Sequence, residues 1–532
     1  MDVEMVAPTL AYTHTIPVVN RAGADLRAFP SRGMRKFTRC AGHHNLDSAD
    51  GSARVSARSR SWRFSMTESL IDRIVDHVLD TPFEALSDSD VLAAKKRLID
   101  TMGCAVSGVA VEGNDAVFDL FHSWQGKPEA GIPGRGERMP LPHAAMITSL
   151  QARSFDFEVT GPEPEGVNEG KMVGHVSSTT EPVALAVGEY TGASGRDLLT
   201  AIVLGGDVAA RVSVSNRFDF DTNFEVCGTS NAFGATAIAG RLLGLDHAQL
   251  RNAFGIVLNL LAGSFQGIWD GVHAFKLPGA TAAYNGILAC QLSARGFGGV
   301  RDALESRQGY FNLYTREPAP QNMVEDLGKV FYVHGQHKLH PSCYGNHNPI
   351  ESVLQIRSEH EFDASQVTSV ELDVAPNRID HFLNQVPTAE DEQPKSLFTI
   401  PYGVANAILR GRPELEHYVA PAIHDPAVLD LAGRVRLLPN LPLGNNQASR
   451  MRIFLADGRV LEAERSAPLG WLRDPTPMAA IVDKFWRNVR FSGAVPEEQA
   501  RRALELIQDL DNVADVADLA AALSAAPLGT PA

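Results

Sequence analysis

Apolar residues recur at helical spacing along most of the chain after residue 69. The first such stretch covers residues 70–79, and a second helix is expected to begin at Ser87 and to continue to Met102. Further helices rich in alanine and glycine are expected at Ala144–Ser154, Ala184–Tyr190, Leu198–Ser213, Ala232–Leu243, Leu250–Leu261 and Ala280–Arg295. Small side chains let helices approach closely. A succession of such helices with few strand signals between them predicts one large all-helical domain.

The joint between two of these helices carries capping signals of its own. Gly244 suits the left-handed residue after a helix end, Asp246 suits an N-cap, and Gln249 falls at the third helical position after it. This spacing predicts a tight helix–helix turn closed by a capping box.

The pattern of apolar positions changes after about residue 335. Alternating apolar and polar residues predict a half-buried strand at Val367–Val374. Further strands are expected at Val435–Leu438, at Met451–Leu455 and, after an Asp-Gly hairpin turn, at Val460–Ala463, with an amphipathic helix at Ser396–Leu409 between the first two. Helical patterns return at Met478–Val489, Glu497–Leu510 and Val516–Ala525.

These changes predict a mainly α fold with an inserted α+β domain. The first part of the helical domain is expected at 66–334, the α+β lid domain at 335–465, and the second helical part at 466–532. Residues 1–65 contain nine Arg and one Lys against five acids and have no sustained apolar period. We interpret them as a disordered basic extension, with a transit peptide or an over-extended start before Met66 as alternatives.

Charge and cysteine content narrow the class of protein. The formal net charge of -15 argues against nucleic acid as the main ligand, because phosphate neutralisation needs a surplus of Lys and Arg. No apolar run approaches the ~20 residues that span a bilayer, so no membrane association is expected. The five cysteines are widely spaced and form no CxxC motif, which indicates a reducing, cytoplasmic setting without a disulfide framework.

Two short loops concentrate groups that can do proton chemistry. One is His337–Tyr344, which holds two imidazoles, a lysine, a thiol and a phenol around a proline. The other is His273–Gly279, again with a histidine and a lysine beside Pro and Gly. Each loop places a lysine, Lys338 or Lys276, shortly before a proline. Together they predict a cationic pocket assembled from separate segments.

Six motifs along the chain carry a family resemblance. They are Leu98–Cys104, Ser154–Thr160, Gly174–Ser178, Phe275–Ala280, His337–Cys343 and Ser396–Tyr402. In this order and spacing the chain after Met66 resembles the MmgE/PrpD family, which includes 2-methylcitrate dehydratase, cis-aconitate decarboxylase and iminodisuccinate epimerase. The family fold is a large helical domain joined to a smaller α+β lid domain, which agrees with the pattern above.

The resemblance also implies an active site. Its catalytic positions are Asp156, His175, Lys276 and Lys338. Known substrates are di- and tricarboxylates that react at a carbon next to a carboxylate, so the two lysines would stabilise the enediolate-like charge that forms there. His175, or a lysine with a lowered pKa, would move the proton, and Asp156 would act as base or orient a neighbour.

Substrate-binding positions follow from the same resemblance, beside simpler alternatives. Thr160 and Tyr402 would hydrogen-bond a carboxylate or a leaving hydroxyl, although Tyr402 equally suits a packed core tyrosine. His340 is a further candidate for the substrate pocket or its support. Lysines beside apolar residues can also merely snorkel. The scheme requires no metal and no cofactor, and the remaining histidines have no ligand pattern of known spacing.

The chain departs from the family at two places that touch the substrate. Glu225 stands where family decarboxylases and dehydratases often carry a histidine, which turns a cation into an anion. The loop between Thr160 and His175 is longer and acidic, with Glu163, Glu165 and Glu169. These changes suit a substrate with fewer carboxylates or with an amine.

The leading expectation is a cofactor-independent lyase that dehydrates a 2-methylcitrate-like hydroxy acid, as in propionate metabolism. Decarboxylation of a cis-aconitate-like acid and epimerisation of an iminodisuccinate-like acid are alternatives. A non-catalytic binding or scaffold protein that kept the fold is the alternative from another class. The family habit and the small-residue helices suggest a homodimer.

Overall fold

The computed structural model describes residues 69–171, 173–216, 224–444, 448–467 and 476–524. These residues belong to one compact unit that spans Met66–Ala532. The extension predicted over residues 1–65 lies outside the described residues.

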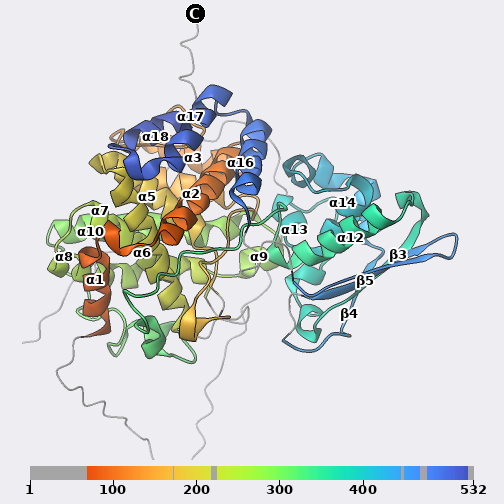
Figure 1. Ribbon diagram of the computed structural model, residues 1–532, viewed down its shortest axis with the longest axis horizontal. Coiled ribbons are helices and arrows are strands. Elements are labelled where there is room, and N and C mark those ends of the chain that lie inside the picture. Colours follow the sequence, from red (N-terminus) through yellow and green to blue (C-terminus); the bar gives the residue numbers. More distant parts are fainter. Residues whose placement is uncertain (1–68, 172, 217–223, 445–447, 468–475, 525–532) are drawn as a thin grey trace, which may run out of the picture. The chain divides into compact units, whose positions relative to one another are not determined.

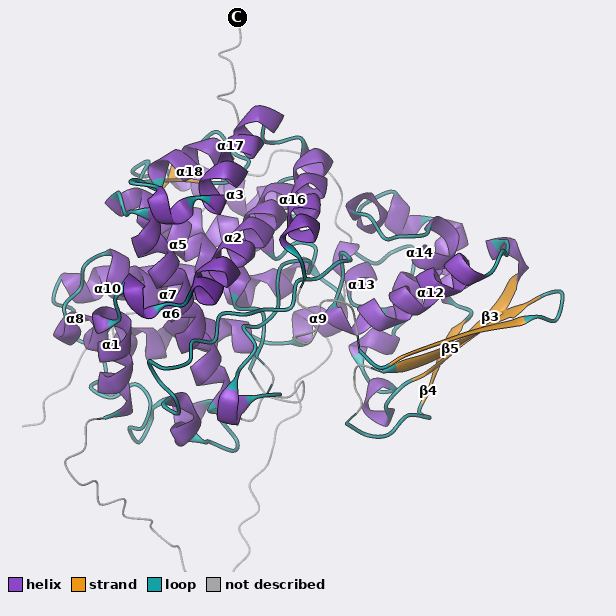
Figure 2. Ribbon diagram, viewed as in Figure 1, coloured by secondary structure: helices purple, strands orange, loops and turns teal. Residues whose placement is uncertain are grey.

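Helices make up most of the structure before residue 335 (Figure 1 and Figure 2). In chain order they are α1 (Leu70–Asp80), α2 (Asp88–Gly108), α3 (Asn114–Trp124), α4 (Leu141–Ala152), α5 (Ser177–Thr191), α6 (Gly195–Val214), α7 (Ser230–Leu242), α8 (His247–Val257), α9 (Gln266–Asp270), α10 (Leu277–Ala294) and α11 (Tyr310–Leu313). A two-residue hairpin, β1 (Ala130–Gly131) with β2 (Arg138–Met139), interrupts them. Every helix predicted in this region is confirmed, whereas α3, α9, α11 and the hairpin were not predicted.

The predicted capping signals are confirmed. The side-chain Oδ1 of Asp246 accepts a hydrogen bond from the N–H of Gln249, and the side-chain Oε1 of Gln249 accepts one from the N–H of Asp246. Gly244 before them has a φ of +70°, the left-handed conformation that glycine adopts without steric cost. Ser87 closes a second capping box at the start of α2.

A four-stranded sheet follows, with the order β4-β3-β5-β6. The strands are β3 (Val367–Asp373), β4 (Val435–Leu438), β5 (Ser449–Leu455) and β6 (Val460–Arg465), and the helices around them are α12 (His347–Glu359), α13 (Gln393–Leu397), α14 (Ile400–Arg410) and α15 (Pro426–Ala432). β4 runs parallel to β3, whereas β5 and β6 form the predicted antiparallel hairpin. α12 and α14 lie along the sheet (Figure 1).

One predicted helix is divided in two. The pattern over Ser396–Leu409 suggested a single helix, but α13 ends at Leu397 and α14 begins at Ile400. Pro401 has no N–H to donate to the carbonyl of Leu397, and its ring would crowd that carbonyl, so an uninterrupted helix cannot pass through this point. Thr399 is extended, with a φ of -121°, and Pro401 instead stands in the first turn of α14.

Two hydrophobic cores hold these elements together. The first is built from α1 to α8, α10 and α11 and also from the last three helices, α16 (Met478–Ser492), α17 (Glu497–Gln508) and α18 (Ala517–Leu523), whereas α9 contributes Ile268 to the second core. The second is built from residues 350–463, and side chains of the helical part, among them Phe155, Phe157 and Phe275, join it. The mainly α fold with a smaller α+β part is therefore confirmed.

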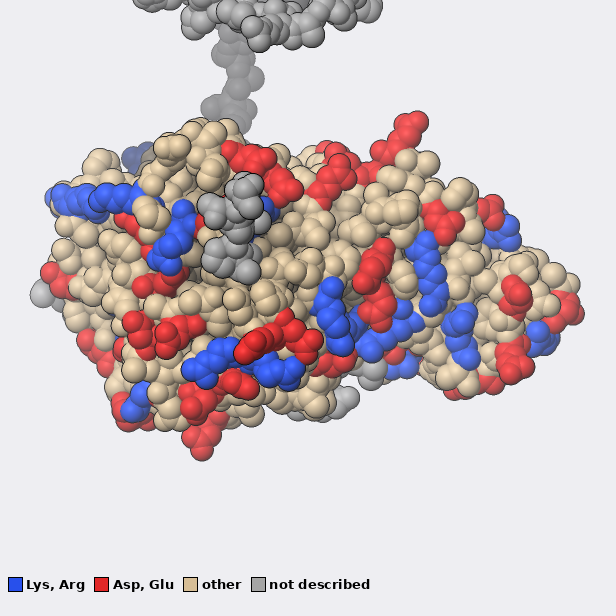
Figure 3. Space-filling model, turned by 90° about the horizontal axis from the view of Figure 1, so that it is seen from above, with Lys and Arg blue, Asp and Glu red and all other residues tan. Residues whose placement is uncertain are grey.

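None of the described helices has the length and apolar content needed to cross a membrane. On the face drawn in Figure 3, acidic and basic side chains are interspersed, and neither sign covers a large continuous area.

The close packing of small-residue helices can be tested at Gly286. A Cβ atom at this position of α10 would lie 2.6 Å from the Cβ of Ala235 on α7 and 2.8 Å from its main chain. We expect Gly286→Ala to lower the free energy of unfolding by roughly 1–3 kcal/mol, more than the helix propensity of alanine returns. Gly298→Ala, which meets no atom within 4 Å, is the control in urea denaturation. Equal stability of the two variants would contradict the expected crowding.

Candidate active site

Three short segments pair beside the second core. Thr160 and Gln336 exchange two N–H···O bonds of 3.0 Å, and Gly161 forms a parallel bridge with His175. The pairing brings the loop before α5 and the loop after α11 to one place. Residues separated by more than 150 positions therefore become neighbours.

The segment after α4 alternates aromatic and acidic side chains. Phe155 and Phe157 enter the second core, where Phe155 meets Phe491 edge to face at 5.3 Å. Asp156 and Glu158 turn instead to charged partners, and both are fully buried. Asp156 has a φ of +47°, a left-handed conformation that aspartate tolerates better than most residues.

Three charged or titratable side chains, Arg153, His175 and Lys338, surround these two carboxylates, and we call the five residues the Asp156 cluster. Arg153 donates through Nη1 to Asp156 and, at 3.1 Å, to Glu158. The Nζ of Lys338 lies 2.9 Å from Oδ2 of Asp156 and also donates to its main-chain carbonyl. The Nδ1 of His175 lies 2.9 Å from Glu158, and its Nε2 lies 3.6 Å from Asp156.

The environment shifts the pKa values of this cluster in different directions. Burial lowers the pKa of Lys338 to about 7, although the carboxylate of Glu158 opposes that fall. Burial, helped by the charges of Arg153 and Lys338, lowers the pKa of His175 to about 3. Burial alone would raise the pKa of Glu158, but Arg153 and His175 outweigh it and lower that pKa. An ionised Glu158 accepts the Nδ1–H of His175, which leaves Nε2 without a proton.

The second predicted lysine is linked to the same segment. Lys276 is buried and donates to Oδ1 of Asn114 at 2.7 Å, and Asn114 donates to the hydroxyl of Ser154 at 2.8 Å. Burial lowers the pKa of Lys276 to about 7, against the charge of Glu392. Both lysines thus contact residues between Ser154 and Asp156, directly or through one side chain, and neither snorkels to the surface.

A second buried ion pair, formed by Asp100 and Lys484, contacts the segment after α4 at Phe157. Asp100 accepts two bonds from Lys484, of 2.8 and 2.9 Å, and lies 2.8 Å from Nδ1 of His337. Lys484 also donates to the carbonyl of Phe157, and its ammonium lies 4.0 Å from the centroid of that ring. This network joins α2, α16, the Phe157 main chain and the residue before Lys338.

Glu225 is a buried carboxyl group whose pKa responds to the charge of Arg153 in the Asp156 cluster. The side chain is 5% exposed, and its Oε2 has no hydrogen-bond partner among the described residues. Burial raises the pKa of Glu225, while bonds from Cys227 and the charge of Arg153 oppose the rise.

The remaining predicted residues lie in different settings. Thr160 takes part in the segment pairing described above. His340 is buried against α12, with its Nε2 2.6 Å from Glu351. Tyr402 belongs to the second core, and its hydroxyl donates to main-chain carbonyls of His417 and Ala422. The contacts of Tyr402 are those of the core tyrosine that was its simpler interpretation.

Sequence reasoning missed several members of this site. They are Asn114, Arg153, Glu158, Asp100 and Lys484, of which Glu158 and Asp100 lie inside motifs that carried the family resemblance. The available signal was a charged residue within an apolar run. Such a residue can be buried in the site or can face solvent, and only its contacts in the structure distinguish these two possibilities.

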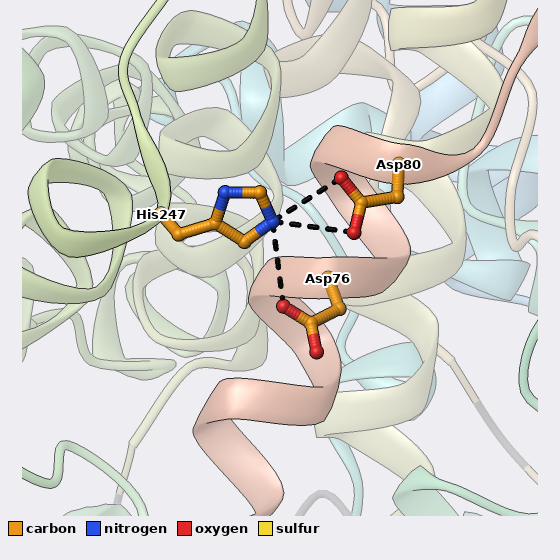
Figure 4. A group of neighbouring side chains, drawn as sticks. All are labelled: Asp76, Asp80 and His247. Carbon is orange, nitrogen blue, oxygen red and sulfur yellow. Dashed lines mark hydrogen bonds and ion pairs between the residues drawn. The ribbon is translucent and has the colours of Figure 1, made fainter.

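Among the residues that the structure describes, two groups have donor atoms within 4.8 Å of one another, close enough to hold a metal ion. One is formed by the carboxylates and the imidazole of the Asp156 cluster, where Arg153 and Lys338 already compensate the negative charge. The other is exposed: the Nε2 of His247 lies 3.4 Å from Asp76 and 3.2 Å from Asp80 (Figure 4). The ion pairs with His247 are sufficient to explain why Asp76 and Asp80 lie close together, without a metal ion.

The chain thus combines a large helical part and a small sheet part with a buried lysine–carboxylate cluster beside the second core. Residues 72–322 match the MmgE/PrpD N-terminal domain, and residues 340–512 match the MmgE/PrpD C-terminal domain. The chain belongs to the MmgE/PrpD family. No curated protein matches it.

The buried pair behind the site should matter for stability. Lys484→Met leaves Asp100 buried without its main counter-charge, so we expect a loss of about 3–5 kcal/mol in the free energy of unfolding. Lys95→Met is the control, because its partner Asp511 is 38% exposed and such pairs contribute only about 0.2–1 kcal/mol. Chemical denaturation measures both losses, and a similar small loss in both variants would contradict the role given to Lys484.

Proposed function

We propose that this protein is a cofactor-independent lyase that abstracts a proton from a carbon next to a carboxylate of a small polycarboxylate. Dehydration of a 2-methylcitrate-like hydroxy acid is the leading form of the reaction. The observation that carries the proposal is Lys338, a fully buried lysine whose pKa lies near neutrality and whose ammonium contacts a buried carboxylate.

The pKa values favour Lys338 as the base. A general base is most effective when its pKa lies near the working pH, because it is then both available and strong enough. His175, with a pKa of about 3, and Glu158, whose pKa is lowered, are weak bases at neutral pH. We assign them to holding Asp156 and the substrate in place, and Asp156 to orienting the Nζ of Lys338.

Lys276 suits the complementary role. In its protonated form it would stabilise the enediolate charge and supply a proton to the departing hydroxyl. The electrons of the broken C–H bond form the double bond, the C–O bond breaks, and the hydroxyl leaves as water. The proton taken from carbon stays on Lys338 until solvent removes it, and Lys276, which gave its proton to the hydroxyl, regains one from solvent.

Glu225 favours a second candidate, the epimerisation of an acid that carries an amine or imine. Its buried Oε2 has no partner among the described residues and could accept an N–H of such a substrate. Proton abstraction is the same first step, but the proton would return to the opposite face of the carbon. Decarboxylation of a cis-aconitate-like acid differs in its first step: the bond between carbon and the carboxylate breaks, CO2 leaves with no C–H bond broken, and the carbanion that remains takes a proton from a protonated lysine.

The test is incubation in heavy water with 2-methylcitrate, cis-aconitate and an iminodisuccinate-like acid. Loss of water, release of CO2, or deuterium incorporation with inversion distinguishes the three reactions. A protein that exchanges and converts none of a broad panel of such acids, yet binds a protein partner tightly, would be the scaffold alternative and would overturn the proposal.

The first functional prediction concerns Lys338. Lys338→Met removes the base but keeps the length of the side chain, and Asp156 retains Arg153, so the fold should persist. We expect the rate of deuterium exchange to fall by about 10²–10⁴-fold. Lys95→Met is the matched control and should keep its rate. A Lys338→Met protein that is folded by circular dichroism and exchanges at a comparable rate would rule out Lys338 as the base.

The dependence of rate on pH gives a further prediction. Below pH 7 Lys338 is increasingly protonated and cannot accept a proton, whereas above pH 7 Lys276 loses the charge that stabilises the enediolate. We therefore expect a bell-shaped profile of deuterium exchange centred near pH 7. Lys276→Arg stays charged, so it should keep the acidic limb and lose the alkaline limb. A flat profile between pH 6 and 8 would contradict this assignment.

A further inference from the structure

We propose that Arg153 binds a carboxylate of the substrate through its Nε and Nη2 atoms. This inference rests on the proposed function, because it takes the Asp156 cluster as the place where the substrate reacts. It adds a specificity-determining contact at a position that the sequence motifs left unassigned.

The hydrogen bonds of Arg153 use only one corner of its guanidinium. Nη1 donates to both Asp156 and Glu158. Among the described residues, Nε and Nη2 donate to no acceptor, and neither is a fully enclosed atom. These two nitrogens form one edge of the planar group, and that edge matches the two oxygens of a carboxylate.

The side chain is held in place before any ligand arrives. Arg153 is only 5% exposed, its two carboxylate partners are fully buried, and its guanidinium carbon lies 5.3 Å from the centroid of the Phe275 ring. Because the fork is already oriented, binding a carboxylate costs little further side-chain entropy.

The location of this edge fits a substrate that reacts at Lys338. Arg153 and Lys338 both contact Asp156, and Phe275 beneath the guanidinium immediately precedes Lys276. A carboxylate on this edge would therefore lie beside the residue that Lys338 contacts and next to the loop that carries Lys276. Glu225 is near enough to interact electrostatically with Arg153, and its raised pKa reduces the repulsion that a bound anion would meet.

A purely structural role would need only the charge of Arg153. A lysine could compensate Asp156 and Glu158 as a point charge, but it cannot present two parallel N–H groups. Arg153→Lys therefore separates the two roles. Arg211→Lys is the control, because Arg211 is likewise a buried arginine paired with a carboxylate, with its Nε 2.7 Å from Asp207, but lies outside the Asp156 cluster.

The experiment measures binding of propane-1,2,3-tricarboxylate by isothermal titration calorimetry. This acid has no hydroxyl to lose, and the corresponding triamide serves as the uncharged control ligand. We expect the Kd of the acid to rise about 10- to 100-fold in Arg153→Lys and to stay within about twofold in Arg211→Lys. An unchanged Kd in a folded Arg153→Lys protein overturns the inference, as does a wild-type protein that does not bind the acid.

A second measurement needs no variant. The acid should slow the modification of Arg153 by phenylglyoxal, followed by peptide mass spectrometry, whereas the triamide should not. Modification at the same rate with and without the acid would overturn the inference. Tight binding that depends on Arg153, without turnover of any acid in heavy water, would instead refute the lyase and leave the carboxylate contact standing.

Discussion

The burial of two carboxylates, Asp156 and Glu158, is the constraint on which the site depends. An unpaired ion in the protein interior costs on the order of several kcal/mol, so each carboxylate must find partners. Arg153, His175 and Lys338 supply them from three separate segments of the chain. Phe155 and Phe157, which flank Asp156, belong to the second core, so the buried carboxylates stand in a segment of the helical part that packs with the sheet part.

The same burial produces the chemistry. A lysine at the surface is protonated at neutral pH, but exclusion of water lowers the pKa of Lys338 and of Lys276 to about 7. The Asp100–Lys484 pair brings α16, near the C-terminal end of the chain, against the carbonyl of Phe157. The residues that follow the sheet therefore help to hold a segment that precedes it, since Phe157 lies 327 positions before Lys484.

Most of the fold could be predicted from local patterns. The helical periods, the capping box at Asp246 and the Asp-Gly hairpin are local signals, and each has the expected structure. The helix predicted over Ser396–Leu409 was wrong as a single element because one proline divides it. For the site, the sequence pointed to both lysines and to Asp156 through motifs. It could not reveal Arg153 or Lys484, since a charged residue has the same appearance in a sequence whether it is buried or solvated.

The sequence by itself determined most of the secondary structure, the change of pattern near residue 335 and the family, because periodicity, capping and motif order are properties of neighbouring residues. The tertiary structure decided which charges meet and which face the core. Tyr402 shares a motif with the site residues, yet its hydroxyl bonds to the main chain. Such outcomes depend on long-range burial, where desolvation and pairing set both the contacts and the pKa values, and no local pattern encodes those distances.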